Sequence, residues 1–300
     1  MRPLRALVIY LFIVFLGGAL LAPWLSWLTQ TVAPSFPHLA HSPFHRFVDR
    51  ALLIVALAGL WPLLRALGVT SLRETGLPPP RGQWNKLGGG LLLGFVTLAA
   101  AAGTAMLWSD RVLVPGLTAH KIVGALFSAL AAAVIVALIE EILFRGGIFG
   151  GLCRTFCWPL ALASSSLIYA LVHFLERADV AGPVAWNSGL ALLPRMLAGF
   201  ADVHALVPGF FSLTLAGILL GLAYRRTSNL YFSIGLHAGW IFRLKTYGAF
   251  TTGIPRAVPG FWGTSKLIDG WPALMVLAVT LALFQFLPLK PAPEPFAISR

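Results

Sequence analysis

Long runs of apolar residues, separated by short polar segments, extend along almost the whole 300-residue chain. A helix that crosses a bilayer needs about 20 apolar residues. The runs predict transmembrane helices at residues 7–28, 51–67, 87–108, 122–144, 159–175, 208–224, 229–242 and 271–287. We therefore expect an all-α fold, a polytopic membrane helix bundle of about eight transmembrane helices.

Polar residues interrupt one further apolar stretch, residues 190–207. We interpret this stretch as an interfacial or re-entrant segment. The runs recur almost to the end of the chain and leave no room for a separate soluble domain. Residues 1–300 are accordingly predicted to form a single integral membrane domain, with N-terminal spans within 7–108 and a C-terminal span at 271–287.

The composition agrees with this pattern, because 58% of the residues are hydrophobic and only 11% are charged. A soluble domain carries about 25% charged residues. The formal net charge is +12, but the basic residues lie mostly in short segments between apolar runs. Such residues orient membrane proteins and contact anionic lipid headgroups. We therefore expect no nucleic-acid partner, and we place both termini in the cytoplasm.

Two adjacent carboxylates, Glu140 and Glu141, lie inside an otherwise apolar run. An ionised carboxylate at bilayer depth costs at least about 2.5 kcal/mol, which marks such residues as functional candidates. Arg145 follows Glu141 at the i+4 position and can pair with it. Glu140 points about 100° away around the helix. The spacing thus predicts one neutralised carboxylate and one that is free for another task.

Two histidines, His173 and His237, lie in other predicted spans. If the chain turns near Cys157, Glu140 and His173 are almost equally far from the turn along an antiparallel helix pair. At about 1.5 Å per residue, they reach the same depth. We therefore expect one site that combines Glu140 with both histidines.

Hydrolysis is the chemistry that these residue types favour. It needs a base to activate water, donors for the developing oxyanion and an acid for the leaving amine. A glutamate can be the base and histidines can contribute the other functions. The same residues, Glu140, His173 and His237, form an alternative zinc triad, although no His-Glu-x-x-His helix is present. A serine nucleophile is disfavoured because no Gly-x-Ser-x-Gly turn surrounds any candidate serine.

The motif Glu140-Glu141-x-x-x-Arg145, followed by an aromatic residue ahead of His173 and by His237, resembles the CPBP family of intramembrane proteases. This family comprises CAAX proteases and bacteriocin-processing proteases and is also called the Abi family. The resemblance covers about residues 120–245, the expected catalytic core. It implies that Glu140 activates water, that Glu141 and Arg145 support the site, and that both histidines assist. It implies no cofactor, with zinc as the alternative.

Two positions depart from the family pattern. The aromatic residue is usually Phe and is Tyr169 here, which adds a hydroxyl. The position four residues after the third-motif histidine is usually Asn or Asp and is Ile241 here, so one polar group is missing. The indole of Trp240 is a partial substitute. We expect Tyr169 and Trp240 to contribute to substrate binding.

The sequence therefore predicts an intramembrane endopeptidase that hydrolyses a peptide bond of a membrane protein or lipidated peptide by glutamate-activated water. The expected location is a bacterial inner membrane, in contact with the lipid bilayer, and a neighbouring membrane enzyme is a further candidate partner. The departure at Ile241 motivates one alternative, a catalytically weak relative that acts as an immunity or scaffold protein. A proton-coupled transporter that uses the carboxylate and histidines is another alternative.

Overall fold

The computed structural model describes residues 3–32, 42–108, 111–180, 182–201, 203–253, 261–262, 266–287 and 289. The chain divides into two compact units. One consists of Met1–Thr70 and Phe174–Asp202, and the other of Ser71–His173 and Val203–Arg300. The second unit holds the predicted site residues Glu140, His173 and His237.

The first unit is built on two long helices, α1 (Pro3–Thr31) and α3 (Phe44–Ala66). Two short helices, α8 (Ser188–Leu192) and η2 (Arg195–Phe200), occupy half of the stretch 190–207 that we interpreted as interfacial or re-entrant. Its core consists of Ala22, Phe44, Phe47, Val48, Ala51, Leu192 and Met196.

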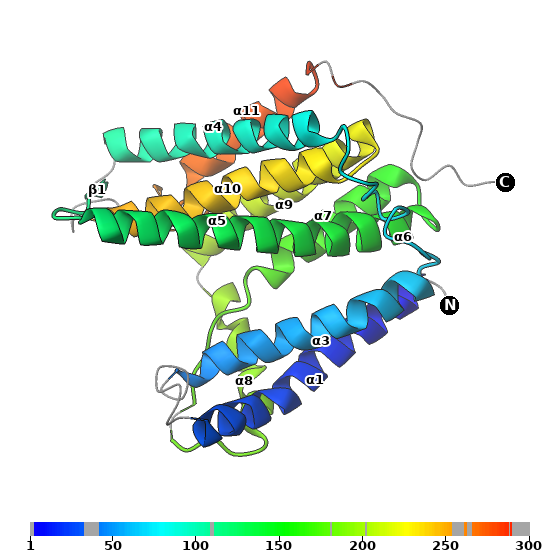
Figure 1. Cartoon of the computed structure of the whole chain (residues 1–300), viewed down its shortest axis with the longest axis vertical. Coiled ribbons are helices and arrows are strands. Elements are labelled where there is room, and N and C mark those ends of the chain that lie inside the picture. The colour runs from blue at the N-terminus through cyan, green and yellow to red at the C-terminus, as the bar shows by residue number, and fades with distance from the viewer. Residues whose placement is uncertain are drawn as a thin grey trace. The chain divides into compact units, whose positions relative to one another are not determined.

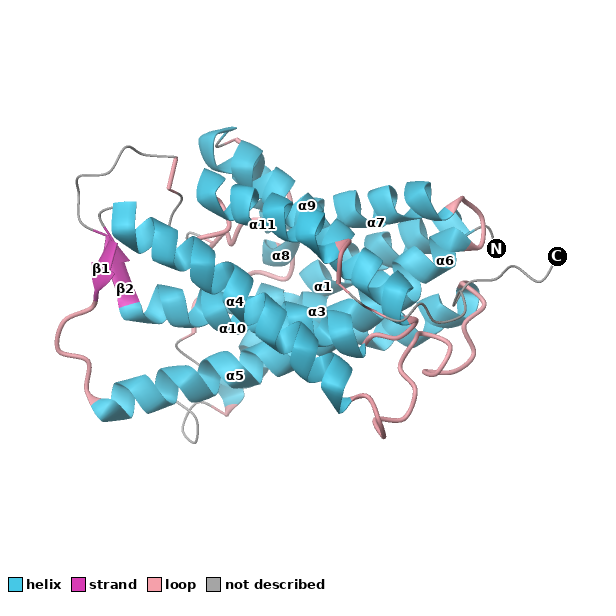
Figure 2. Ribbon diagram, turned by 90° about the horizontal axis from the view of Figure 1, so that it is seen from above, coloured by secondary structure: helices cyan, strands magenta, loops and turns pink. Residues whose placement is uncertain are grey.

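The second unit contains the remaining helices (Figure 1). In chain order they are α4 (Trp84–Trp108), α5 (Ala119–Glu141), η1 (Ile142–Phe149), α6 (Gly150–Cys153), α7 (Trp158–Val172), α9 (Val203–Thr227), α10 (Tyr231–Phe250) and α11 (Trp271–Phe284). The short strands β1 (Arg111–Leu113) and β2 (Thr251–Gly253) pair antiparallel beside the ends of α4 and α10 (Figure 2). Apart from this ribbon, the regular elements that the structure describes are helical, which confirms the predicted all-α fold.

Each of the eight predicted spans lies largely within a helix of the structure. Five helical stretches are long and apolar enough to cross a membrane, namely Pro3–Thr31, Phe44–Ala66, Trp84–Trp108, Ala119–Cys153 and Leu206–Thr227. The helices α7 and α11 are shorter, with 15 and 14 residues. The chain is thus an integral membrane protein.

Local sequence explains where the helices of the second unit begin. Thr118 caps α5, because its hydroxyl oxygen accepts a hydrogen bond from the backbone N–H of Lys121 at 3.4 Å. Such caps satisfy one of the free N–H groups at a helix start. Pro159 lies in the first turn of α7, where its missing N–H costs nothing. The turn that we predicted near Cys157 lies there, because Cys157 directly precedes α7.

Glycines allow α4 and α10 to cross at very short distance. A Cβ atom at Gly94 would lie 2.1 Å from the carbonyl oxygen of Leu236, and one at Gly235 would lie 2.1 Å from that of Leu87. Gly90 and Gly239 are equally restricted. Each helix thus carries a Gly-x-x-x-Gly pair, a pattern that brings membrane helices into close contact. Because His237 lies between the two glycines of α10, this crossing fixes its position.

Candidate active site

The helix that carries the two glutamates changes its winding just after them. The α-helix α5 ends at Glu141 and continues without a break into the wider π-helical stretch η1. Arg145 lies in this stretch and remains close to the preceding turn, since its Nη1 is 3.0 Å from Oε1 of Glu141. The predicted i+4 ion pair is therefore present in the structure. Both side chains are buried, with exposed fractions of 3% for Arg145 and 0% for Glu141.

Glu141 has a second partner from another helix. Its Oε1 also lies 3.0 Å from Nδ1 of His237 in α10. Arg145 in turn donates from Nη2 to the carbonyl of Gly217 at 3.4 Å, and its guanidinium lies 4.7 Å from the centre of the Tyr169 ring. A buried ion pair is tolerated only with good geometry and additional partners. This network ties together α5, η1, α7, α9 and α10 around Glu141.

The proton positions on both histidines follow from their Nδ1 partners. Oε1 of Glu141 forms the ion pair with Arg145 and accepts the hydrogen bond from Nδ1 of His237. Nδ1 of His173 lies 2.7 Å from the carbonyl oxygen of Tyr169, which can only accept. Each neutral ring therefore carries its hydrogen on Nδ1 and an unprotonated nitrogen at Nε2.

Both Nε2 atoms face Glu140. Its Oε2 lies 3.9 Å from Nε2 of His173 and 3.8 Å from Nε2 of His237. This oxygen is buried and makes no hydrogen bond within the structure. The side chains of His173 and Glu140 are partly exposed, at 31% and 24%. The structure thus brings Glu140 and both histidines together, and a molecule can reach them.

Three acceptors that face each other at these distances need a proton donor between them. A water molecule can donate to the carboxylate and to one imidazole at once. Its oxygen then lies beside a base, which is the arrangement that general-base hydrolysis requires. The free carboxylate is Glu140 and the neutralised one is Glu141, in agreement with the i+4 argument from the sequence.

Tyr169 also belongs to this group, whereas Trp240 lies elsewhere. The Tyr169 hydroxyl is 3.3 Å from Nε2 of His237 and is buried. The indole N–H of Trp240 donates to the hydroxyl of Thr97 in α4 at 2.9 Å, inside the core. The structure therefore gives the Trp240 N–H a partner in α4 rather than a place beside Glu140. Trp240 is three residues after His237, about 60° around α10, and its indole packs toward α4.

Two further groups are candidates by residue type: Ser233, four residues before His237, for a nucleophile, and the loop histidines His38, His41 and His45 for a metal site. Their members within the described residues have structural partners. The hydroxyl of Ser233 donates to the carbonyl of Leu230 at 3.0 Å. His38 and His41 lie outside the described residues. His45 donates from its backbone N–H to Asp179 at 2.8 Å, and its ring lies 2.7 Å from the same carboxylate. Burial raises the pKa of Asp179, but the hydrogen bonds from His45 outweigh it and leave this pKa below the ordinary value.

A zinc ion fits the cluster poorly. In a tetrahedral site with ligand bonds near 2.0–2.1 Å, ligand atoms lie about 3.4 Å apart. Oε2 of Glu140 is 3.9 and 3.8 Å from the two Nε2 atoms. Within the described part of the chain, no group of three or more His, Cys, Asp and Glu side chains is arranged to hold a metal ion. The mechanism below accordingly uses the side chains alone.

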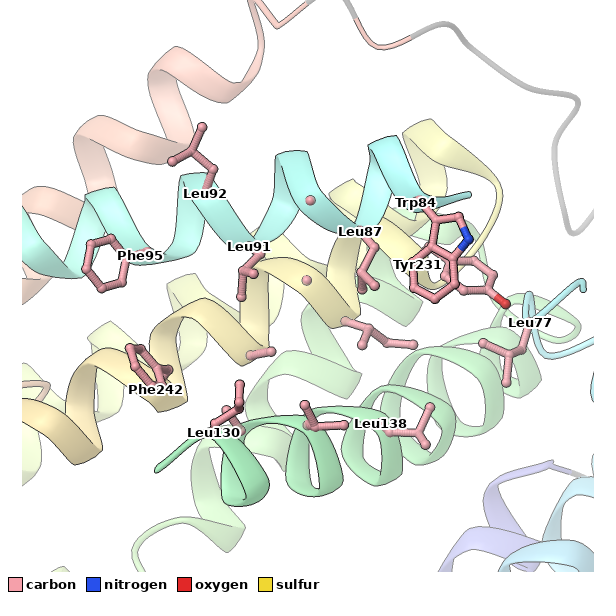
Figure 3. A pocket seen from close by; sticks show the side chains of 16 residues that line it. Leu77, Trp84, Leu87, Leu91, Leu92, Phe95, Leu130, Leu138, Tyr231 and Phe242 are labelled. Carbon is pink, nitrogen blue, oxygen red and sulfur yellow. The ribbon is translucent and has the colours of Figure 1, made fainter. Parts of the chain in front are cut away.

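An apolar groove of about 670 Å³ lies between α4, α5 and α10 (Figure 3). Trp84, Leu77 and Tyr231 lie at one end of it and Phe95 and Phe242 at the other. Its walls also include Leu138 of α5 and Ala238 of α10. These two are three residues before Glu141 and directly after His237, so the groove borders the helices that carry the site. The sequence analysis did not foresee it, since a groove depends on how three helices pack.

The model of one protein family matches the chain, over residues 121–242. Its description is "Type II CAAX prenyl endopeptidase Rce1-like". No curated protein and no solved structure shows a significant match to the chain. The matched segment includes the glutamate pair, Arg145, Tyr169 and both histidines, which agrees with the resemblance to CAAX proteases noted in the sequence. This segment, with its buried Glu141–Arg145 pair and its two histidines, is thus similar to the Rce1-like CAAX prenyl endopeptidase family.

Proposed function

We propose that the protein is an intramembrane endopeptidase that hydrolyses a peptide bond of a lipidated, membrane-associated protein or peptide by glutamate-activated water. One observation carries the proposal. Oε2 of Glu140 is buried without a hydrogen bond and lies 3.8–3.9 Å from the Nε2 atoms of both histidines. The family match to CAAX prenyl endopeptidases supports a peptidase of this kind.

Glu140 is the general base in this mechanism. A water molecule donates one hydrogen bond to Glu140 and the other to Nε2 of His173. As the water oxygen attacks the carbonyl carbon of the scissile bond, its proton moves to Glu140 and the carbonyl π electrons move to the oxygen. The tetrahedral oxyanion then collapses, the C–N bond breaks, and Glu140 returns the proton to the leaving amine. A general base typically contributes about 10²–10⁴-fold to the rate.

Glu141 and Arg145 position the site without entering the reaction. Glu141 accepts from Nδ1 of His237 at 3.0 Å and is neutralised by Arg145 at the same distance. The carboxylate thereby fixes the tautomer and the orientation of the imidazole. Both partners contact Oε1 of Glu141, and the whole side chain is buried, whereas Glu140 is partly exposed and faces both Nε2 atoms. The role of base is therefore assigned to Glu140.

The apolar groove is the proposed binding site for the lipid chain of the substrate. Its lining side chains are almost entirely hydrocarbon (Figure 3). It extends along α4 from Trp84 to Phe95, which is about 16 Å at 1.5 Å per residue. A prenyl or acyl chain of about that length can lie in it, with the attached peptide leading toward α10 and the glutamates.

Two alternatives make different predictions for one experiment. In membranes from cells that produce the wild type or Glu140→Ala, protein termini are identified by mass spectrometry. An endopeptidase generates new termini that are absent with Glu140→Ala. An immunity or scaffold protein, or a transporter, generates none with either chain. Glu74→Gln is the control, because it changes a glutamate outside the site and should leave cleavage unchanged. Glu74 is exposed and accepts a hydrogen bond from Ser71, and a glutamine can accept the same bond.

Protein purified from the same cells allows a test of the metal-free mechanism. Purified wild-type protein treated with a chelator and then passed through a desalting column should retain its activity on a prenylated peptide. Loss of activity that added zinc restores would contradict the mechanism proposed here and would support zinc at Glu140, His173 and His237.

A further inference from the structure

The candidate active site has many acceptors and few donors. Nδ1 of His237 and Nδ1 of His173 already donate to Glu141 and to a backbone carbonyl. The guanidinium of Arg145 is directed at Glu141 and at the carbonyl of Gly217. With both rings neutral, none of these groups offers a hydrogen bond toward Glu140. Peptide hydrolysis nevertheless requires a donor for the oxyanion.

The Tyr169 hydroxyl is a donor in the right place. It lies 3.3 Å from Nε2 of His237, the same nitrogen that faces Oε2 of Glu140 at 3.8 Å. Because Nδ1 of His237 holds the ring hydrogen, Nε2 accepts and the tyrosine O–H donates. Among the described side chains that contact the cluster, the phenol is the one neutral hydroxyl.

The surroundings of Tyr169 hold the ring firmly. It packs edge-on against Phe144, with 5.1 Å between ring centres, and the guanidinium of Arg145 lies over its face at 4.7 Å. The ring of His173 lies on another side, 4.4 Å away. These contacts involve only the aromatic ring. A phenylalanine can therefore keep the packing and lose the hydroxyl alone.

We propose that the Tyr169 hydroxyl is the neutral hydrogen-bond donor of the active site, held by Nε2 of His237 in the resting enzyme and given to the oxyanion during hydrolysis. The inference rests on the proposed function. As water attacks and its proton passes to Glu140, the substrate oxygen becomes negative and is a stronger acceptor than the imidazole. The phenol redirects its hydrogen bond from Nε2 of His237 to this oxygen and keeps its proton. The proton transfers of the reaction therefore remain those between water, Glu140 and the leaving amine.

The proposal also gives a physical meaning to Ile241. This residue is at the i+4 position from His237, on the same side of α10. An aliphatic side chain there supplies no hydrogen bond, and Tyr169 supplies one from the facing helix α7. We infer that the hydroxyl of Tyr169 compensates for the missing polar group at Ile241. An asparagine introduced at Ile241 should then replace part of the lost donor.

The test compares Tyr169→Phe, Tyr169→Phe/Ile241→Asn and the wild type in detergent, with a quenched-fluorescent S-farnesylated peptide as the substrate. Tyr169→Phe should lower kcat by about 10²–10³-fold, the typical loss for one oxyanion donor, with KM and the thermal midpoint close to wild type. The double variant should regain part of kcat. Tyr224→Phe is the matched control, because the Tyr224 hydroxyl is also buried and donates to the carbonyl of Thr75 at 3.0 Å.

The outcomes separate this inference from the proposed function. Suppose that the wild type cleaves the peptide, Glu140→Gln does not, and Tyr169→Phe retains the wild-type kcat. The donor role of Tyr169 is then overturned, and the proposed peptidase function is still supported. The donor role is also overturned if both Tyr169→Phe and Tyr224→Phe lower kcat and the thermal midpoint, because the effect is then structural. A double variant as slow as Tyr169→Phe overturns the compensation at Ile241. If the wild-type protein does not cleave the farnesylated peptide, the proposed function itself is contradicted.

Discussion

Nδ1 of His237 lies 3.0 Å from Oε1 of Glu141, although 96 residues separate the two in the chain. This hydrogen bond sets the direction of the imidazole, so that Nε2 faces Glu140 and the Tyr169 hydroxyl. The second glutamate of the pair is therefore a positioning residue. A chemical consequence is that the two adjacent carboxylates have different environments. Glu141 is paired with Arg145 and fully buried, whereas Glu140 is partly exposed and faces the Nε2 atoms of two histidines.

Arg145→Ala should lower both stability and activity. Removal of the guanidinium leaves the fully buried Glu141 without its charge partner. Breaking a buried pair in this way costs about 3–5 kcal/mol. The thermal midpoint in detergent measures the effect, with Arg81→Ala as an exposed control. Equal midpoints for Arg145→Ala and the wild type would refute the importance of the pair.

Gly94→Ala should destabilise the protein, while the same change at Gly103 of the same helix should not. A Cβ atom at Gly94 meets the carbonyl oxygen of Leu236 at 2.1 Å, whereas one at Gly103 meets nothing within 4 Å. Overpacking of this kind typically costs about 1–3 kcal/mol. Activity should fall as well, because the crossing of α4 and α10 holds His237. Unchanged unfolding of Gly94→Ala would show that the helices do not cross this closely.

Gly88→Leu should weaken the binding of lipidated substrates. Gly88 lines the groove, and a Cβ atom there meets nothing within 4 Å, so a larger side chain can enter the groove without disturbing the backbone. We expect a higher KM for a farnesylated peptide and an unchanged kcat. Gly103→Leu is the control on the same helix. Equal KM values for Gly88→Leu and the wild type would place the lipid chain elsewhere.

The site is predicted to open toward the outer side of the membrane. His173 directly follows α7, at the end opposite to Cys157. The distribution of positive charges in the sequence predicts that Cys157 lies on the cytoplasmic side. An impermeant thiol reagent applied to intact cells should therefore label Val180→Cys in a Cys157→Ser background. The native Cys157, which is exposed, should react only after permeabilisation. The reverse pattern would invert the topology.

Much of the second unit could be predicted from the sequence, because local patterns determine it. Apolar runs predicted the helices, and the i+4 spacing predicted the pair of Glu141 and Arg145. Equal distances from the turn near Cys157 predicted that Glu140 and His173 meet. In the structure, Oε2 of Glu140 lies 3.9 Å from Nε2 of His173. These inferences need only the geometry of one helix or of one helical hairpin.

Contacts between segments that are distant in the chain could not be predicted from local patterns. The hydrogen bond from His237 to Glu141 and the groove depend on how α10 packs against α4 and α5. One sequence signal was available and unused, the pairs Gly90/Gly94 and Gly235/Gly239, which indicate a close helix crossing. The paired strands β1 and β2 were also missed, because three residues each are too few for a recognisable alternation.

The central claim is that Glu140 activates water, and the kcat of purified Glu140→Gln measures it directly. Glutamine preserves the size of the side chain and removes the base, and Oε2 of Glu140 makes no hydrogen bond whose loss would disturb the fold. The account predicts a wild-type thermal midpoint and a kcat on the farnesylated peptide lower by about 10²–10⁴-fold. A folded Glu140→Gln protein that cleaves this peptide at the wild-type rate would contradict it.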